Sequence, residues 1–227
     1  MSTSGGLNAT PPPVADTGLR GVVHGGIVGT TGYPQGYLMK IVCRELTPDR
    51  WPDVEALFGP RGAYGGCWCM YWRSAKGEKW PDVQGDPNKR RFRKLVRDGK
   101  AHGALAYAGT EPVGWVSFDR RIDFDRLDRA PSLACGDAER VWSVPCFYVK
   151  SGWRGKGVGD ALLAFAVKTL KRYGADIVEG YPVKVASGAK APAAFVYTGL
   201  EPMFAKAGFT SAAVRERGKQ RVRLTLK

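Results

Sequence analysis

Apolar and polar positions along the chain follow two periods, one typical of strands and one typical of helices. Strands are expected at 40–46, 103–109, 112–118, 141–149 and 176–183. Helices are expected at 47–58, 86–98 and 158–172, where Thr47-Pro48 and Gly174 are capping residues at a start and an end. The polar segment 119–139 is expected to form a loop. The chain therefore mixes strands and helices.

The first 38 residues differ from everything that follows. They are rich in Gly, Ser, Thr and Pro, include Pro11-Pro12-Pro13, and carry only Asp16 and Arg20 as charges. Such a composition cannot bury enough apolar surface to offset the entropy of ordering. The sequence therefore predicts a disordered tail at 1–38 and one folded domain at 39–227.

Composition limits the class of protein. With 227 residues and 44% apolar content, the chain is long enough for one packed domain. It contains neither an apolar run of about 20 residues, as a membrane span requires, nor a signal-peptide pattern. Five cysteines, an odd number, do not indicate a disulfide framework. These features favour a cytoplasmic protein that does not enter a membrane.

The chain is strongly basic, with 35 Lys and Arg residues against 21 acids and a net charge of +14. Residues 86–100 hold seven of these cations and residues 204–227 another seven. Such a surplus is compatible with an anionic acceptor, an acidic protein or RNA as a partner. General solubility explains it equally well, because 89–94 reads as the solvent face of a helix.

Glycines and cations gather between the strand at 141–149 and the helix at 158–172, in the turn 154–159. A helix start leaves backbone N–H groups without intrahelical partners and carries partial positive charge, so it attracts phosphate. Gly157 and Gly159 let an anion approach the main chain, and Arg154 and Lys156 add positive charge. The spacing matches neither the phosphate-binding loop of NTPases nor the dinucleotide fingerprint. A pyrophosphate remains the expected guest.

The string Arg-x-x-Gly-x-Gly at 154–159 resembles the acetyl-CoA signature of the GNAT N-acyltransferases. The strands at 141–149 and 176–183 also resemble that family, as does 201–209, which resembles its short helix ending in Gly-Phe. The resemblance covers about residues 40 to 227. It implies an α/β (α+β) fold with a single mixed, mostly antiparallel sheet of about six to seven strands flanked by about four helices.

The resemblance implies acetyl-CoA, or another acyl-CoA, as co-substrate. Its pyrophosphate would lie at 154–159 and its thioester near Cys146 to Tyr148, where the family uses a free main-chain N–H to stabilise the developing negative charge. The residues expected to bind it are Phe147, Tyr148, Val149, Arg154, Gly155, Lys156, Gly157, Val158, Gly159, Asp160 and Phe204.

An attacking amine must lose a proton, so a general base is sought. Ser143 stands where part of the family carries a glutamate, and a hydroxyl is a poor base. Glu139 and Glu179 are the nearest carboxylates along the sequence. These three residues are candidate catalytic groups, with a structural role as the alternative for each glutamate.

The departing thiolate needs a proton or must leave unaided. The family often places a tyrosine where this chain has Phe204, which has no hydroxyl. Tyr197 or Tyr148 can substitute as the general acid, and a thiol with a pKa of about 8.5 is also a tolerable leaving group. Tyr197 is therefore the fourth catalytic candidate.

Residues 62–73 have an unusual composition for a loop, with aromatic residues and cysteines side by side. Since the family walls its acceptor site with this region, we expect Trp68, Tyr71 and Trp72, together with Tyr181, to bind the acceptor. The alternative is a small hydrophobic cluster that packs helices against the sheet. Cys67-x-Cys69 lacks the spacing and partners of a zinc site, so no metal is expected. A covalent acyl-cysteine is also not expected, because no His base lies beside either cysteine.

Together these observations predict an N-acyltransferase that moves an acetyl or similar acyl group from CoA directly to an amine. The expected acceptor is a small molecule, such as an antibiotic or a biosynthetic intermediate. Two alternatives stay open: an enzyme that modifies aminoacyl-tRNA or a protein, and a non-catalytic module that binds CoA or RNA. A homodimer is compatible with the sequence.

Overall fold

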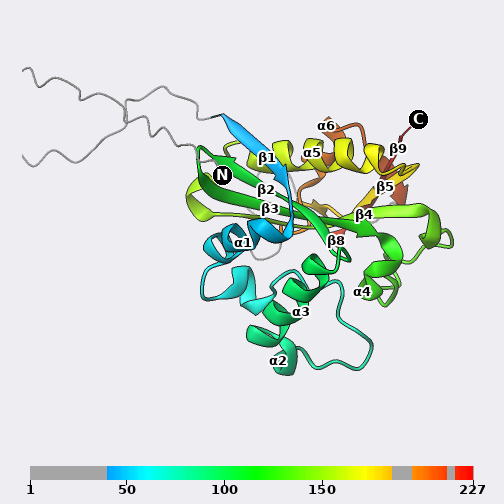
Figure 1. Ribbon diagram of the computed structural model, residues 1–227. Helices are drawn as coiled ribbons and strands as arrows, with labels where there is room; N and C mark the ends of the chain where they lie inside the picture. Colours follow the sequence, from blue (N-terminus) through cyan, green and yellow to red (C-terminus); the bar gives the residue numbers. More distant parts are fainter. Residues whose placement is uncertain (1–39, 186–195, 214–217, 227) are drawn as a thin grey trace, which may run out of the picture. The chain divides into compact units, whose positions relative to one another are not determined.

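A seven-stranded sheet runs through the centre of the protein (Figure 1). The computed structural model describes residues 40–185, 196–213 and 218–226. Its strands, in spatial order, are β1 Ile41–Glu45, β2 His102–Ala108, β3 Glu111–Arg120, β4 Val141–Val149, β5 Ile177–Gly180, β9 Arg221–Thr225 and β7 Thr210–Ala213. Only β4 and β5 pair in parallel. The expected mixed, mostly antiparallel sheet is confirmed, and the expected tail at 1–38 lies outside the described residues.

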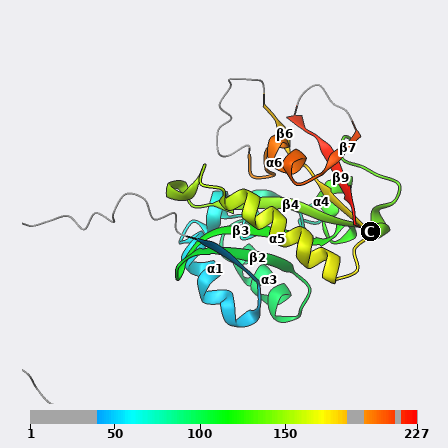
Figure 2. The same ribbon diagram turned by 90° about the horizontal axis from the view of Figure 1, so that it is seen from above.

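Helices cover both faces of this sheet (Figures 1 and 2). They are α1 Trp51–Phe58, α2 Trp80–Val83, α3 Asp86–Arg97, α4 Asp125–Asp128, α5 Val158–Arg172 and α6 Glu201–Lys206. Residues of β2 alternate between two cores, since Ala104 and Ala106 pack with α5 while Leu105 and Tyr107 pack with α1 and α3. This period of two is the expected result of burying both faces of a strand.

Two expectations about the chain after β3 were wrong in detail. The segment 119–139 is not an irregular loop throughout, because it contains the last residues of β3, the 3₁₀ turns 121–123 and 138–140, and α4. The strand expected at 176–183 is divided into β5 and a separate β6, Val183–Lys184, which pairs with β8, Gly218–Lys219, in a second small sheet.

The sheet opens between β4 and β5. The two strands pair only from Val141 to Val144, and the register of β4 against β3 shifts at the next residues. Pro145 lies at this shift, as expected for a residue that has no N–H and is found in sheets mainly at edges and bulges. The remaining residues of β4, 146–149, therefore have no β5 neighbour.

Candidate active site

A groove of about 770 Å³ occupies the opening beside β4. Its walls come from the turn before α5 and the start of that helix, from the 58–80 region, from β4 and from residues 196–203. Its lining includes Phe58, Tyr64, Cys67, Cys69, Tyr71, Trp80, Trp115, Cys146, Phe147, Tyr148, Val149, Trp153, Arg154, Gly155, Gly157, Val158, Gly159, Asp160, Val196, Tyr197, Leu200 and Met203. The groove thus connects the predicted phosphate turn to the predicted acceptor region.

The phosphate end of the groove depends on backbone conformation. Gly155 and Gly157 have φ of 71° and 77°, in the left-handed region that L side chains rarely adopt. Gly157 is the N-cap of α5, so the first N–H groups of this 15-residue helix have no intrahelical acceptors. Gly159 is different, because a Cβ there would lie 3.1 Å from the Met203 sulfur. The turn is suited to an anion because its N–H groups are free of intrahelical acceptors and its glycines leave the backbone uncovered.

The charged side chains of this turn have distinct positions. Arg154 lines the groove and donates from Nε to the Val149 carbonyl at 3.1 Å. Lys156 is not part of the lining, and its Nζ lies 5.1 Å from the centre of the Trp153 ring. Asp160, the only carboxylate among the described residues of the lining, is paired with Lys206 at 3.0 Å. This ion pair reduces its repulsion of an anion.

The backbone of β4 presents N–H groups to the groove in alternation. Lys150 N–H donates to the Val113 carbonyl at 3.0 Å, which makes Val149 and Gly114 a non-hydrogen-bonded pair of the antiparallel ladder. The Val149 N–H therefore points away from β3, toward the groove. Phe147 N–H points to the same side and donates to the Tyr197 carbonyl at 2.6 Å. Of the two N–H groups that β4 turns to this side, that of Phe147 is therefore bonded to the Tyr197 carbonyl in this conformation.

Aromatic rings close the acceptor end. The Tyr71 ring packs edge-on against Tyr197 and Trp80, with centroids 5.8 and 5.4 Å apart. Burial raises the pKa of the Tyr197 phenol, so the group keeps its proton at neutral pH and is not available as a base. Burial also raises the pKa of Cys67 to about 11 and that of Cys69 well above its usual range. Both thiols are therefore protonated and poor nucleophiles.

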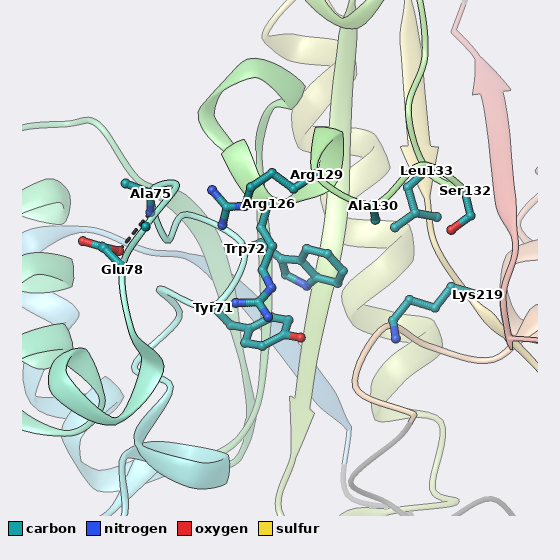
Figure 3. Close-up of a pocket in the computed structure, with 11 residues that line it drawn as sticks. Tyr71, Trp72, Ala75, Glu78, Arg126, Arg129, Ala130, Ser132, Leu133 and Lys219 are labelled. Carbon is teal, nitrogen blue, oxygen red and sulfur yellow. Dashed lines mark hydrogen bonds between the residues drawn. The ribbon is translucent and has the colours of Figure 1, made fainter.

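A second cavity of about 570 Å³ adjoins the groove at Tyr71, which lines both (Figure 3). Its walls combine aromatic and charged side chains. They are Tyr71, Trp72, Ala75, Gly77, Glu78, Arg126, Arg129, Ala130, Ser132, Leu133 and Lys219. The polar segment 119–139 supplies part of these walls, including both arginines.

The four predicted acceptor residues separate into two groups. Tyr71 lines both cavities and Trp72 lines the second. Trp68 lines neither cavity; it stacks on Trp51 with centroids 6.3 Å apart and is 4% exposed. Trp68 therefore belongs to a hydrophobic cluster, which is the alternative that the sequence left open, and does not face an acceptor. Tyr181 is also fully buried and lines neither cavity.

Three of the predicted catalytic residues lie away from the groove. Ser143 Oγ is 2.7 Å from the Tyr181 hydroxyl, which donates to Glu179 at 2.8 Å. Glu179 also accepts from Arg223 Nε at 2.7 Å, and burial raises the pKa of Tyr181 well above its usual range. Glu139 is exposed on the turn before β4. The geometry gives Ser143 and Glu179 a structural role, and leaves Tyr197 as the candidate that lines the groove.

Phe204 is also placed differently from the expectation. It is fully buried, with its ring 6.1 Å from Phe147 and 5.0 Å from Phe209. A Cβ on Gly180 would lie 2.1 Å from this ring, so Phe204 packs directly against the end of β5. The neighbouring Met203 lines the groove instead.

Sequence reasoning missed the bulge and the cationic cavity. Pro145 inside a predicted strand was a signal that could have located the bulge. Arg126 and Lys219 are 93 positions apart, so no local pattern could have joined them.

The described residues contain no group of three or more His, Cys, Asp or Glu side chains able to hold a metal ion. Among the helices of the same residues, none is long and apolar enough to cross a membrane.

The comparison with solved structures finds similar chains at low sequence identity. They include an N-acetyltransferase from Staphylococcus aureus Mu50, with 14% identity, coverage of 83% of this chain and 99% of that chain, and a TM-score of 0.47. A putative acetyltransferase, yncA, from Salmonella typhimurium, solved with acetyl-CoA, has 14% identity, 82% and 94% coverage and a TM-score of 0.47. A ribosomal-protein-alanine N-acetyltransferase from Brucella melitensis has 15% identity, 82% and 99% coverage and a TM-score of 0.47.

A search of curated protein sequences gives no match. The model of the acetyltransferase (GNAT) family, in contrast, matches residues 69–186, just over half of the chain. This span begins in the wall of the acceptor end and includes β4, the glycine turn and α5. The chain therefore belongs to the GNAT acetyltransferase family.

Proposed function

We propose that this protein transfers an acetyl or similar acyl group from acyl-CoA directly to the amine of a small molecule. The observation that carries the proposal is the continuous groove from the turn at 154–159 to Tyr71 and Tyr197. A long, narrow co-substrate fits such a groove, with its phosphates at one end and its reactive group at the other.

The residues at the phosphate end fit the pyrophosphate of CoA. The N–H groups at the start of α5 supply donors, and the left-handed Gly155 and Gly157 keep side chains away from them. Arg154 is the cation that lines the groove. At the other end, Phe147 and Val149 present N–H groups on the side where β5 has ended.

Bound acyl-CoA supplies a thioester: the amine nitrogen bonds to the carbonyl carbon, the carbon–sulfur bond breaks, and the thiolate takes up a proton. The chain's part is to stabilise charge and move protons. Phe147 N–H can donate to the developing oxyanion once it exchanges its bond to the Tyr197 carbonyl. Tyr197 and Tyr148 line the groove and can protonate the thiolate. Asp160, the one carboxylate among the described lining residues, lies at the start of α5 and is paired with Lys206, so the proton of the amine leaves through water.

Calorimetric titration with acetyl-CoA tests the phosphate end. We expect Arg154→Glu to weaken binding at least tenfold, because it places a negative charge beside the pyrophosphate. Lys168→Glu makes the same charge change on the exposed face of α5 and should bind like the wild type. Gly157→Asp should also weaken binding, whereas Gly152→Ala, with nothing within 4 Å of the added Cβ, should not. Equal affinity in all four variants would remove the turn from the site.

Thiol release with a panel of amines then separates an enzyme from a non-catalytic binder.

The basic stretches favour a small acceptor over RNA, because many of their cations are already paired. In α3, Lys89 pairs with Glu55 at 2.8 Å, Arg91 with Glu78 at 2.8 Å, and Lys94 with Asp98. Nucleic acid that copurifies and is lost at high salt would support the RNA alternative.

A further inference from the structure

Three cations line the second cavity. Arg126 belongs to α4, Arg129 follows that helix, and Lys219 comes from β8. Figure 3 shows the two arginines entering from the α4 side and Lys219 from the opposite wall, with Trp72 and Tyr71 between them. Elements far apart in the sequence thus bring positive charge to one cavity.

None of these three cations has a carboxylate partner among the residues described in 40–185, 196–213 and 218–226. Arg129 donates to the Ser74 carbonyl at 2.5 Å, and Arg126 to Ser74 Oγ at 3.4 Å, which are neutral acceptors. Glu78 is the only acid among the lining residues that the structure describes. It accepts from Arg91 at 2.8 Å and from the Ala75 N–H at 2.9 Å, so its charge is already compensated. The cavity therefore carries uncompensated positive charge.

A cation of the neighbouring strand β9 differs from these three, because Arg223 pairs with both Glu179 and Asp137. Burial lowers the pKa of Lys219, because desolvation disfavours its charged form. Cations held together without counterions in a concave site are the usual design of an anion-binding site.

The cavity lies directly beside the acyl-transfer end of the groove. The Arg126 guanidinium is 4.1 Å from the centre of the Tyr71 ring, and Lys219 Nζ is 5.1 Å from the centre of the Tyr197 ring. Both tyrosines line the groove. One aromatic layer therefore separates the cations from the place where the amine would react.

We propose that the acceptor is a small amine that also carries a carboxylate or phosphate, and that Arg126, Arg129 and Lys219 bind this acidic group. The proposal rests on the proposed acyl transfer and names the acceptor class of that same site. A cavity of about 570 Å³ has the size of a small-molecule site, not of a polymer groove. The Tyr71 and Trp72 rings in its walls add apolar contact for the body of the acceptor.

Matched pairs of amines test the proposal with acetyl-CoA as donor. The phosphate pair is O-phosphotyramine and tyramine, and the carboxylate pair is L-phenylalanine and L-phenylalaninamide. We expect kcat/KM for the acidic member of at least one pair to exceed that of its neutral partner at least tenfold. Arg126→Gln and Lys219→Gln should bring this ratio close to one. Arg90→Gln removes an equal charge from the exposed face of α3 and should leave the ratio unchanged. The pair with the larger ratio identifies the acidic group.

Direct binding of the same four amines, measured by calorimetry without a donor, keeps the test independent of acyl transfer. Preferential binding of the acidic members, lost in Arg126→Gln, supports the cavity as an anion site even if no transfer is detected. Equal binding and equal turnover of both members of each pair in the wild type would overturn the proposal. A ratio that survives in both Arg126→Gln and Lys219→Gln would overturn it as well. Failure of the proposed acyl transfer is recognised separately, by the absence of acetyl-CoA binding or of thiol release with any amine.

Discussion

Two groups of cations lie on either side of the contact between Trp72 and Tyr181, whose ring centroids are 6.3 Å apart. On the Tyr181 side, Arg121 and Glu179 are both fully buried and 3.5 Å apart, and Arg223 adds a second bond to the same carboxylate. On the Trp72 side, Arg126 and Lys219 line an open cavity, and neither forms an ion pair with a carboxylate in the described part of the chain.

The difference shows that pairing decides whether a charged side chain serves the structure or remains available for a ligand. A buried carboxylate surrounded by arginines and a tyrosine hydroxyl has its hydrogen-bonding capacity used, so it stabilises the structure and has nothing left for a substrate. Cations that line a cavity without counterions contribute little to folding and remain available for a ligand. Sequence alone had marked Glu179 as a catalytic candidate and Arg126 as part of a loop.

Removing the central carboxylate of the paired group should have the largest effect on stability. Glu179→Gln leaves the buried Arg121 without the negative charge 3.5 Å away. Removing one partner of a buried ion pair in this way lowers the free energy of unfolding by about 3 to 5 kcal/mol. Urea denaturation measures the loss. Glu139→Gln is the matched control, because that glutamate is exposed and should change stability by less than about 0.5 kcal/mol. Similar values for the two variants would contradict the structural role of Glu179.

The unpaired group should instead respond in binding, and in a pH-dependent way. Burial lowers the pKa of Lys219 below its usual value of 10.5, and a bound acid should raise it again. The affinity for the acidic amine should therefore fall several-fold as the pH is raised toward 10.5, because Lys219 loses its proton over this range. Calorimetry across this range, with Lys219→Arg as the variant that keeps its charge, measures the effect. An identical pH profile in Lys219→Arg would exclude Lys219 as the titrating group.

The same cavity cations should matter little for folding. In the double variant Arg126→Gln/Lys219→Gln, no carboxylate loses a partner, so the free energy of unfolding should change by less than about 1 kcal/mol. Urea denaturation of this variant beside Glu179→Gln compares the two groups directly. A loss as large as that of Glu179→Gln would show that the cavity cations are structural after all.

A third ion cluster, formed by His102, Asp119 and Arg73 at the start of β2, lies between the two groups in character, because it is paired but partly open to solvent. His102 Nδ1 lies 2.7 Å from Asp119, and this hydrogen bond raises the pKa of the imidazole above its usual value of 6.5. The protonated form is favoured in the folded state, so this contribution is complete below pH 6.5 and is lost as pH rises through the raised pKa.

The melting temperature should accordingly decline slightly over that range in the wild type. His102→Gln should flatten the decline, while Arg73, which is also paired with Asp119, continues to hold the carboxylate. This is the smallest effect expected here, since His102 is about one-third exposed. An equal decline in the wild type and in the variant would assign it to other groups.

The features that the sequence determined by itself are local ones. The bounds of β4 and α5 agree with the expected 141–149 and 158–172, because apolar spacing and the glycine turn between them act over neighbouring residues. The same locality is why a pyrophosphate site at 154–159 can be proposed from the sequence, since its donors would be consecutive main-chain N–H groups. The family match over residues 69–186 includes this unit.

The tertiary structure alone decided which side chains meet. Trp68 and Tyr71 are three positions apart, yet one packs in the core and the other lines both cavities, helped by positive φ angles of 30° at Trp68 and 52° at Cys69. Glu179 was buried by arginines from other elements, and Lys219 was brought to Arg126 by the chain's return through β8. Such meetings depend on contacts between distant segments, and periodicity within a segment carries no information about them.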